Sequence, residues 1–178
     1  LLLHTLESRE VSQTGGGDVI LNSDGRIHVW NGGSGIQSDG DVTLNSTANT
    51  TVSFSITLTG GASLDINAGT LAELNNTGDI TTDGGNVSID AAAGDITVNN
   101  GRKIDVAGGT IDLTASGNVT LGQLVSTATG NAITVTATTG AIIDGGDTGG
   151  EDIIATNGQA VLTAATGIGS AGAIEIDV

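Results

Sequence analysis

The side chains best suited to chemistry lie in one glycine-rich acidic stretch, Asp144-Gly145-Gly146-Asp147-Thr148-Gly149-Gly150-Glu151-Asp152. Carboxylates are the oxygen ligands that calcium prefers, so Asp144, Asp147, Glu151 and Asp152 are candidate calcium ligands. The calcium-binding nonapeptide requires GGxGxDxUx in tandem. This stretch misses that spacing and does not recur. We therefore favour a solvated acidic loop that holds no cofactor, with calcium as the alternative.

Catalytic groups are harder to assemble from this sequence. The histidines, His4 and His28, lie far apart, and His28 occupies an outward position between two aliphatic residues. Glycosidases need paired carboxylates, and lyases need a basic residue beside a calcium cluster. Asp65, Ser88 and Asp112 take successive outward positions, but no Arg or Lys accompanies them. We therefore expect no catalytic residue and no enzymatic activity.

Basic and aromatic residues are scarce. The chain has 20 acidic and 4 basic residues and a formal charge of −16, so Arg102-Lys103, the only basic doublet, is expected to relieve the local negative field. Such a surface disfavours nucleic acid and anionic lipid as partners. Trp30 and Phe54 are the only aromatic residues. Trp30 is expected to face outward or lie at a corner, where it could pack against the amino-terminal segment or stack on a sugar ring.

The elements that would position these residues form an internal repeat. The motif Gly85-Asn86-Val87-Ser88-Ile89-Asp90-Ala91 has close copies whose first apolar residues are 22 to 24 positions apart. These residues are Val19, Val42, Leu64, Val87, Ile111 and Ile133, and two looser copies begin at Ala160 and Ile174. A constant period of this length is typical of solenoids.

Within each copy, apolar and polar residues alternate, as in Val87-Ser88-Ile89-Asp90, which is the pattern of a half-buried strand. One or two shorter apolar pairs follow in each period, separated by Gly, Asn, Asp and Ser. Three strands per turn of chain give a coil of triangular section, with equivalent strands stacked in parallel. We predict an all-β, single-stranded parallel β-helix of about seven coils, each of roughly 22–24 residues.

Stacking of the coils would align equivalent positions into columns. Two aliphatic columns should face inward: Val19, Val42, Leu64, Val87, Ile111, Ile133, and Leu21, Leu44, Ile66, Ile89, Leu113, Val135. An outward column runs through Asn22, Asn45, Asn67 and Asp90. Stacked asparagines can bond amide to amide, and a polar binding strip is the alternative interpretation.

Residues 1–14 do not match the repeat. They are interpreted as an amino-terminal cap, a linker or an assembly strand that pairs with another copy, and residues 15–178 as the β-helix. The chain begins with three leucines and stops at Val178 inside the pattern, so we expect it to be part of something longer. It contains no cysteine, which excludes disulfides and thiolate metal sites.

The repeats also resemble those of a known family. Gly85-Asn86-Val87-Ser88-Ile89-Asp90-Ala91, Gly117-Asn118-Val119-Thr120-Leu121 and Thr166-Gly167-Ile168-Gly169 are similar to repeats of filamentous-haemagglutinin-type bacterial exoproteins, some of them adhesins. Over residues 15–178 the resemblance implies a right-handed parallel β-helix, an extracellular or cell-surface location and a role as stalk or adhesive fibre. The family's proline-containing secretion motif is missing, since the chain has no proline.

We therefore expect a structural segment of a large secreted or cell-surface bacterial protein. Its partners would be neighbouring coils of the same chain, further copies of itself, or host or matrix glycans, with no nucleic acid and no insertion into membrane. The first alternative is a self-assembling extracellular filament subunit, joined through residues 1–14 and the open coil at Val178. The second alternative is a carbohydrate-active β-helix enzyme.

Overall fold

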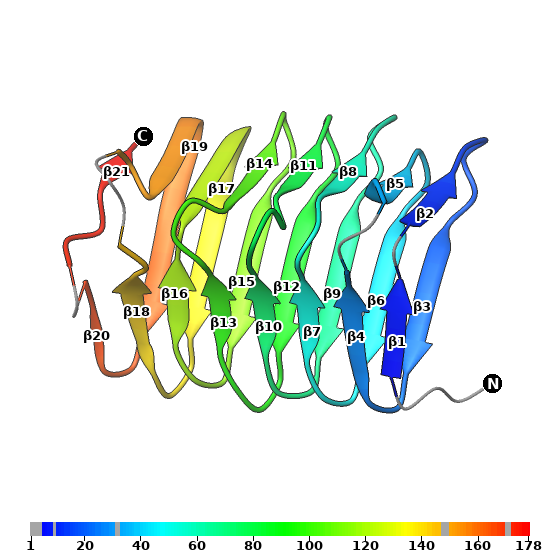
Figure 1. Cartoon of the computed structure of the whole chain (residues 1–178). Helices are drawn as coiled ribbons and strands as arrows, with labels where there is room; N and C mark the ends of the chain where they lie inside the picture. Colours follow the sequence, from blue (N-terminus) through cyan, green and yellow to red (C-terminus); the bar gives the residue numbers. More distant parts are fainter. Residues whose placement is uncertain (1–4, 9, 31–32, 147–149, 170–171) are drawn as a thin grey trace.

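The chain winds into a parallel β-solenoid of about seven turns (Figure 1). The computed structural model describes residues 5–8, 10–30, 33–146, 150–169 and 172–178. No helix occurs among these residues, and therefore none that could cross a membrane. The near strands in Figure 1 run upward and the strands behind them run downward as the coils advance from N to C, which is a right-handed winding.

The strands form three faces, and every pair of neighbouring strands is parallel. Face A contains β1 (Thr5–Ser8), β4 (Arg26–Val29), β7 (Thr50–Val52), β10 (Ala72–Leu74), β13 (Ile96–Val98), β16 (Val119–Leu121), β18 (Ala141–Asp144) and β20 (Gly167–Ile168). Face B contains β2 (Glu10–Gln13), β5 (Gly35–Ser38), β8 (Ile56–Leu58), β11 (Ile80–Thr82), β14 (Lys103–Val106), the first halves of β17 (Gln123–Ala137) and β19 (Ile153–Ala164), and β21 (Ile176–Asp177). Face C contains β3 (Val19–Ser23), β6 (Val42–Ser46), β9 (Leu64–Ala68), β12 (Val87–Ala91), β15 (Ile111–Ala115) and the second halves of β17 and β19.

The predicted columns are confirmed position by position on face C. Val42 pairs with Val19 on one side and with Leu64 on the other, and Ile89 pairs with Ile66 and Leu113. Nearly all these aliphatic side chains are buried, and with the inward residues of faces A and B they form one continuous core. At about 1.5–3 kcal/mol for each large apolar side chain, this burial is the main gross stabilising term.

Polar side chains join successive coils at the corners. Between faces B and C, Asp41, Ser63 and Asn86 each accept the backbone N–H of the equivalent residue one coil later, at 2.8, 3.1 and 2.9 Å. The backbone N–H groups of Ser63, Asn86 and Thr110 at this corner are therefore satisfied by side chains and not by a strand ladder. Within the strands of face C, the asparagine column forms as predicted: Asn45 donates to Asn22 at 2.8 Å, and Asn67 donates to Asn45 at 2.9 Å.

A second kind of corner contact joins a carboxylate of one coil to two glycines of the coil before it, and it occurs twice in the first four coils. The carboxylate of Asp39 accepts the N–H groups of Gly15 and Gly16 in the coil before it, at 2.7 and 2.9 Å. Asp83 accepts those of Gly60 and Gly61 in the same way, at 3.0 and 2.9 Å. We call these contacts the aspartate clips. The glycines have positive φ, which presents two adjacent N–H groups to one carboxylate.

Two segments lie differently from what the repeat pattern indicates. Part of the amino-terminal segment, which the sequence sets apart as cap, linker or assembly strand, lies on the solenoid as its first coil, because β1 pairs with β4 and β2 pairs with β5. The last looser copy, which begins at Ile174, does not continue face C. Its strand β21 pairs with Ile153–Ile154 on face B, because Ile176 follows Ile153 by 23 residues, a full coil, whereas Ile174 follows the preceding face C copy at Ala160 by only 14.

Candidate functional site

The corners between faces A and B differ in length, and the difference hollows the surface. Residues 99–102 connect β13 to β14, Gly122 alone connects β16 to β17, and residues 145–152 separate β18 from β19. Among the described residues, Asn100, Gly101 and Arg102 line one side of the single-residue corner, and Gly146, Gly150 and Glu151 line the other. The result is a cavity of about 320 Å³, here called the corner notch, with Gly122 and Gln123 at its base.

Gly122 is the residue that permits this close approach. A Cβ at this position would lie 2.5 Å from the carbonyl oxygen of Arg102 and 2.8 Å from that of Asn99, both in the backbone. Since real Cβ atoms do not come so near to backbone oxygen, any other residue would push the corners apart. Gln123 continues the contact, because its N–H donates to the Arg102 carbonyl at 3.0 Å.

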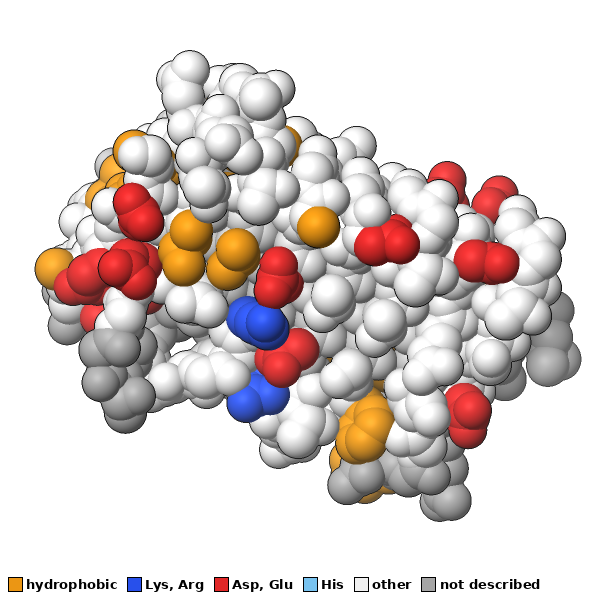
Figure 2. All heavy atoms as spheres, turned by 90° about the horizontal axis from the view of Figure 1, so that it is seen from above, with side chains coloured by type: hydrophobic (Ala, Val, Ile, Leu, Met, Phe, Trp, Pro, Cys, Tyr) orange, Lys and Arg blue, Asp and Glu red, His pale blue; other side chains and the backbone are white. Residues whose placement is uncertain are grey.

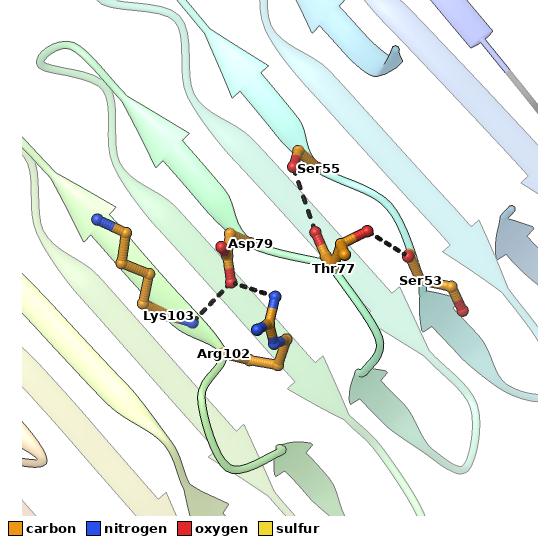
Figure 3. A network of polar contacts seen from close by, with 6 residues as sticks. All are labelled: Ser53, Ser55, Thr77, Asp79, Arg102 and Lys103. Atoms are coloured by element: carbon orange, nitrogen blue, oxygen red, sulfur yellow. Dashed lines mark hydrogen bonds and ion pairs between the residues drawn. The ribbon is translucent and has the colours of Figure 1, made fainter. Parts of the chain in front are cut away.

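One wall of the corner notch carries the basic doublet (Figure 3). The Nη1 of Arg102 lies 3.2 Å from Oδ1 of Asp79, and the backbone N–H of Lys103 donates to the same oxygen at 3.0 Å. The Nζ of Lys103 lies 2.9 Å from Oδ2 of Asp105. Figure 2 shows the basic side chains beside acidic ones on this face. The doublet thus contacts acidic groups, as expected for relief of the negative field.

The opposite wall is acidic and contains Glu151 and Asp152. The side chain of Gln123 crosses the base and donates through Nε2 to the Glu151 carbonyl at 3.1 Å. Asp152 is 2% exposed, and its Oδ2 accepts the N–H of Glu175 at 3.1 Å. Burial, reinforced by the neighbouring carboxylates of Asp144 and Glu175, raises the pKa of Asp152 to about 6. A buried carboxyl with a raised pKa beside a cavity is a feature typical of functional sites.

Of the four candidate calcium ligands, the structure describes Asp144, Glu151 and Asp152. Asp147 lies outside the described residues. Asp144 uses Oδ1 to accept the N–H of Gly146 at 2.6 Å. Over the described part of the chain, no group of three or more His, Cys, Asp or Glu residues is arranged to hold a metal ion.

His28 contacts a serine that sequence reasoning missed. Its Nε2 lies 2.8 Å from Oγ of Ser53, and the Ser53 hydroxyl donates to Oδ1 of Asn75 at 2.6 Å. Ser53 is 2% exposed, and since its proton already bonds an amide oxygen, it is not activated as a nucleophile. The spacing of 25 residues, which is the 23-residue coil that pairs His28 with Thr51 plus two residues, is the signal that could have revealed the contact.

The other candidate residues occupy outward positions. Asp65, Ser88 and Asp112 stack on face C as expected from the register. Trp30 is 45% exposed, and its ring meets that of His28 edge to face, with 4.8 Å between the centroids. The asparagine column borders a shallow depression, but its amides bond to one another.

Comparison of the chain with protein-family models, with curated proteins and with solved structures finds no match.

Proposed function

We propose that the chain is a structural segment, a stalk or adhesive fibre, of a large secreted or cell-surface bacterial protein. The observation that carries the proposal is the unbroken stacking of the faces, with eight parallel strands in succession on face A. In such a solenoid each coil contacts only its neighbours, so that added coils add length without changing the cross-section. The resemblance of the repeats to filamentous-haemagglutinin-type exoproteins supports the location.

The types of residue that face outward, and the net charge of the chain, are compatible with a role as a stalk. Outward positions on the faces are mainly Thr, Ser, Asn and Asp, and the net charge is −16. Strong like charge keeps separate chains apart in solution. The corner contacts are made by short side chains, which lose little conformational freedom when they are ordered.

Two measurements test this proposal. Small-angle scattering of the purified chain should give a rod about 34 Å long over seven coils at roughly 4.8 Å per coil. Antibodies against the chain should label intact cells of the source bacterium, and protease added to those cells should remove the label. A compact particle, or label that appears only after the cells are lysed, would contradict the proposal.

A second candidate is a self-assembling filament subunit. It is favoured by the apolar side chains exposed toward the carboxyl end, where Ile168, Ile176 and Val178 are 49%, 44% and 69% exposed. Parallel strands with an open edge can accept strands of another copy. Electron microscopy over a series of protein concentrations distinguishes the candidates, because a filament subunit forms fibres that Ile176→Lys shortens or abolishes. A stable monomer at every concentration would contradict the filament subunit and favour the stalk segment.

A further inference from the structure

We propose that Asn100, at the corner between β13 and β14, is a site of spontaneous deamidation. Asparagine is among the thermolabile residues of proteins. The backbone nitrogen of the following Gly101 attacks Cγ of Asn100, the bond from Cγ to the side-chain nitrogen breaks, and ammonia leaves with the proton of the attacking nitrogen. Water then opens the resulting succinimide ring at either carbonyl, which gives aspartate or isoaspartate. Water is the only co-reactant, and the inference does not depend on the proposed stalk role.

The sequence alone does not select this residue, because a glycine follows an asparagine three times, at Asn31-Gly32, Asn100-Gly101 and Asn157-Gly158. The first pair lies outside the described residues. Asn100 and Asn157 are both exposed, so the access of water does not distinguish them. The difference lies in the backbone that must move for the ring to close.

At the pair Asn157-Gly158 the backbone is held in a sheet. Both residues belong to β19 and pair with residues 129–130 of β17. The side-chain amide is held as well, because Nδ2 of Asn157 donates to the carbonyl of Thr127 at 3.2 Å. The glycine nitrogen can reach the side chain of Asn157 only if the ladder between β17 and β19 opens, and such openings have a high free energy.

At the pair Asn100-Gly101 the backbone forms the two central residues of a tight turn. The N–H of Arg102 donates to the carbonyl of Asn99 at 2.8 Å and closes the turn. Within the described part of the chain, neither Asn100 nor Gly101 takes part in a hydrogen bond. Gly101 has a φ of +73° and open space where a Cβ would lie. Rotation of the backbone at Asn100 therefore breaks one hydrogen bond, that between Asn99 and Arg102, which makes local opening easier here.

The corner is anchored on both sides of the reacting pair. Before it, the N–H of Asn99 donates to the carbonyl of Leu74 at 3.1 Å. After it, the carbonyl of Arg102 accepts the N–H of Gln123 at 3.0 Å, and the Arg102 guanidinium lies 3.2 Å from Asp79. The product adds one negative charge and, as isoaspartate, one backbone carbon, and both changes fall within the turn. The modified chain is therefore expected to remain folded.

The test is incubation of the purified full chain at mildly alkaline pH, with and without denaturing urea, followed by mass spectrometry of its peptides. In the folded chain, the one-dalton gain and isoaspartate should appear at Asn100 at least about tenfold faster than at Asn157. In urea the two asparagines should react at similar rates, because each is followed by glycine. Asn100→Gln, whose longer side chain would have to close a six-membered ring, should abolish the product at this corner. Asn157→Gln is the matched control and should leave it unchanged.

The proposal is overturned if Asn100 stays intact in the folded chain, or if Asn157 reacts as fast as Asn100 in the absence of urea. Circular dichroism of the modified chain should give the β spectrum of the unmodified one. Loss of that spectrum would contradict the inference that the change stays within the turn.

Discussion

Asp39 and Asp83 each join two successive coils at a corner of the solenoid through a single side chain. Each carboxylate receives two backbone N–H groups of the preceding coil, so two donors that have no strand partner are satisfied by one residue. These bonds, from Gly15 and Gly16 to Asp39 and from Gly61 and Gly60 to Asp83, lower the pKa of both carboxyls. The aspartate clips therefore link the stability of the solenoid to pH.

The first prediction concerns Asp83→Asn. A carboxyl whose pKa is lowered by folding stabilises the fold above its unfolded pKa, and that contribution is lost as the pH falls through the folded value. The variant should therefore unfold at a lower urea concentration than the natural chain near neutral pH, and the difference should vanish in strong acid. Asp65→Asn, which removes the charge of an exposed residue on face C, is the matched control. An Asp83→Asn difference that persists unchanged in acid would contradict this account.

Asp152 makes stability depend on pH in the opposite direction, because folding raises its pKa. Its folded pKa of about 6 lies above its ordinary value of 3.8, so the folded state holds the proton more tightly than the unfolded state. Stability therefore falls as the pH rises between these values. Asp152→Asn should melt at a higher temperature than the natural chain above about pH 6, and the advantage should shrink toward pH 4. Thermal melts at several pH values measure this. Asp177→Asn, an exposed change at the same end, should show no such trend.

At the scale of the element, equivalent residues form columns whose middle members have more partners than their ends. Asn45 is the donor to Asn22 and the acceptor from Asn67, whereas Asn22 contributes one bond to this column. A column of this kind should show position-dependent effects even when the residue type is the same.

We expect Asn45→Ala to lower the free energy of unfolding by about 1–2 kcal/mol, because it removes two hydrogen bonds worth roughly 0.5–1.5 kcal/mol each. Asn22→Ala should cost about half as much. Urea denaturation of both variants measures the ratio. Equal losses would show that the amide bonds contribute nothing beyond the local preference for Asn.

The elements also show what the sequence can predict. Period and alternation determine face C, because an inward residue such as Leu44 must lie over Leu21 and under Ile66. The same alternation occurs on all three faces, so it could not reveal that the copy at Ile174 had moved to face B. The corner notch was invisible for another reason: it arises from the relative lengths of three stacked corners, and only one of these, residues 145–152, stood out in the sequence.

At the scale of the whole molecule, the charge of −16 acts against the compact state. The carboxylates are spread over the coils and only four basic residues oppose them, so their mutual repulsion is released on unfolding. The melting temperature should therefore rise with sodium chloride between about 10 mM and 300 mM, as the Debye length shortens from roughly 30 Å to below 8 Å. Calorimetry at constant pH measures this, and a melting temperature that falls with salt would show that favourable ion pairs dominate.

The aspartate clips also affect how the first part of the solenoid could change in length. Each clip joins an aspartate-bearing coil to the glycine-bearing coil before it, so the first four coils are organised as two pairs rather than as four equal units. Removing one coil would leave a glycine pair without its anion, or bring two aspartate turns into contact. Within these four coils, a gene could gain or lose one pair of coils and keep every remaining aspartate clip intact.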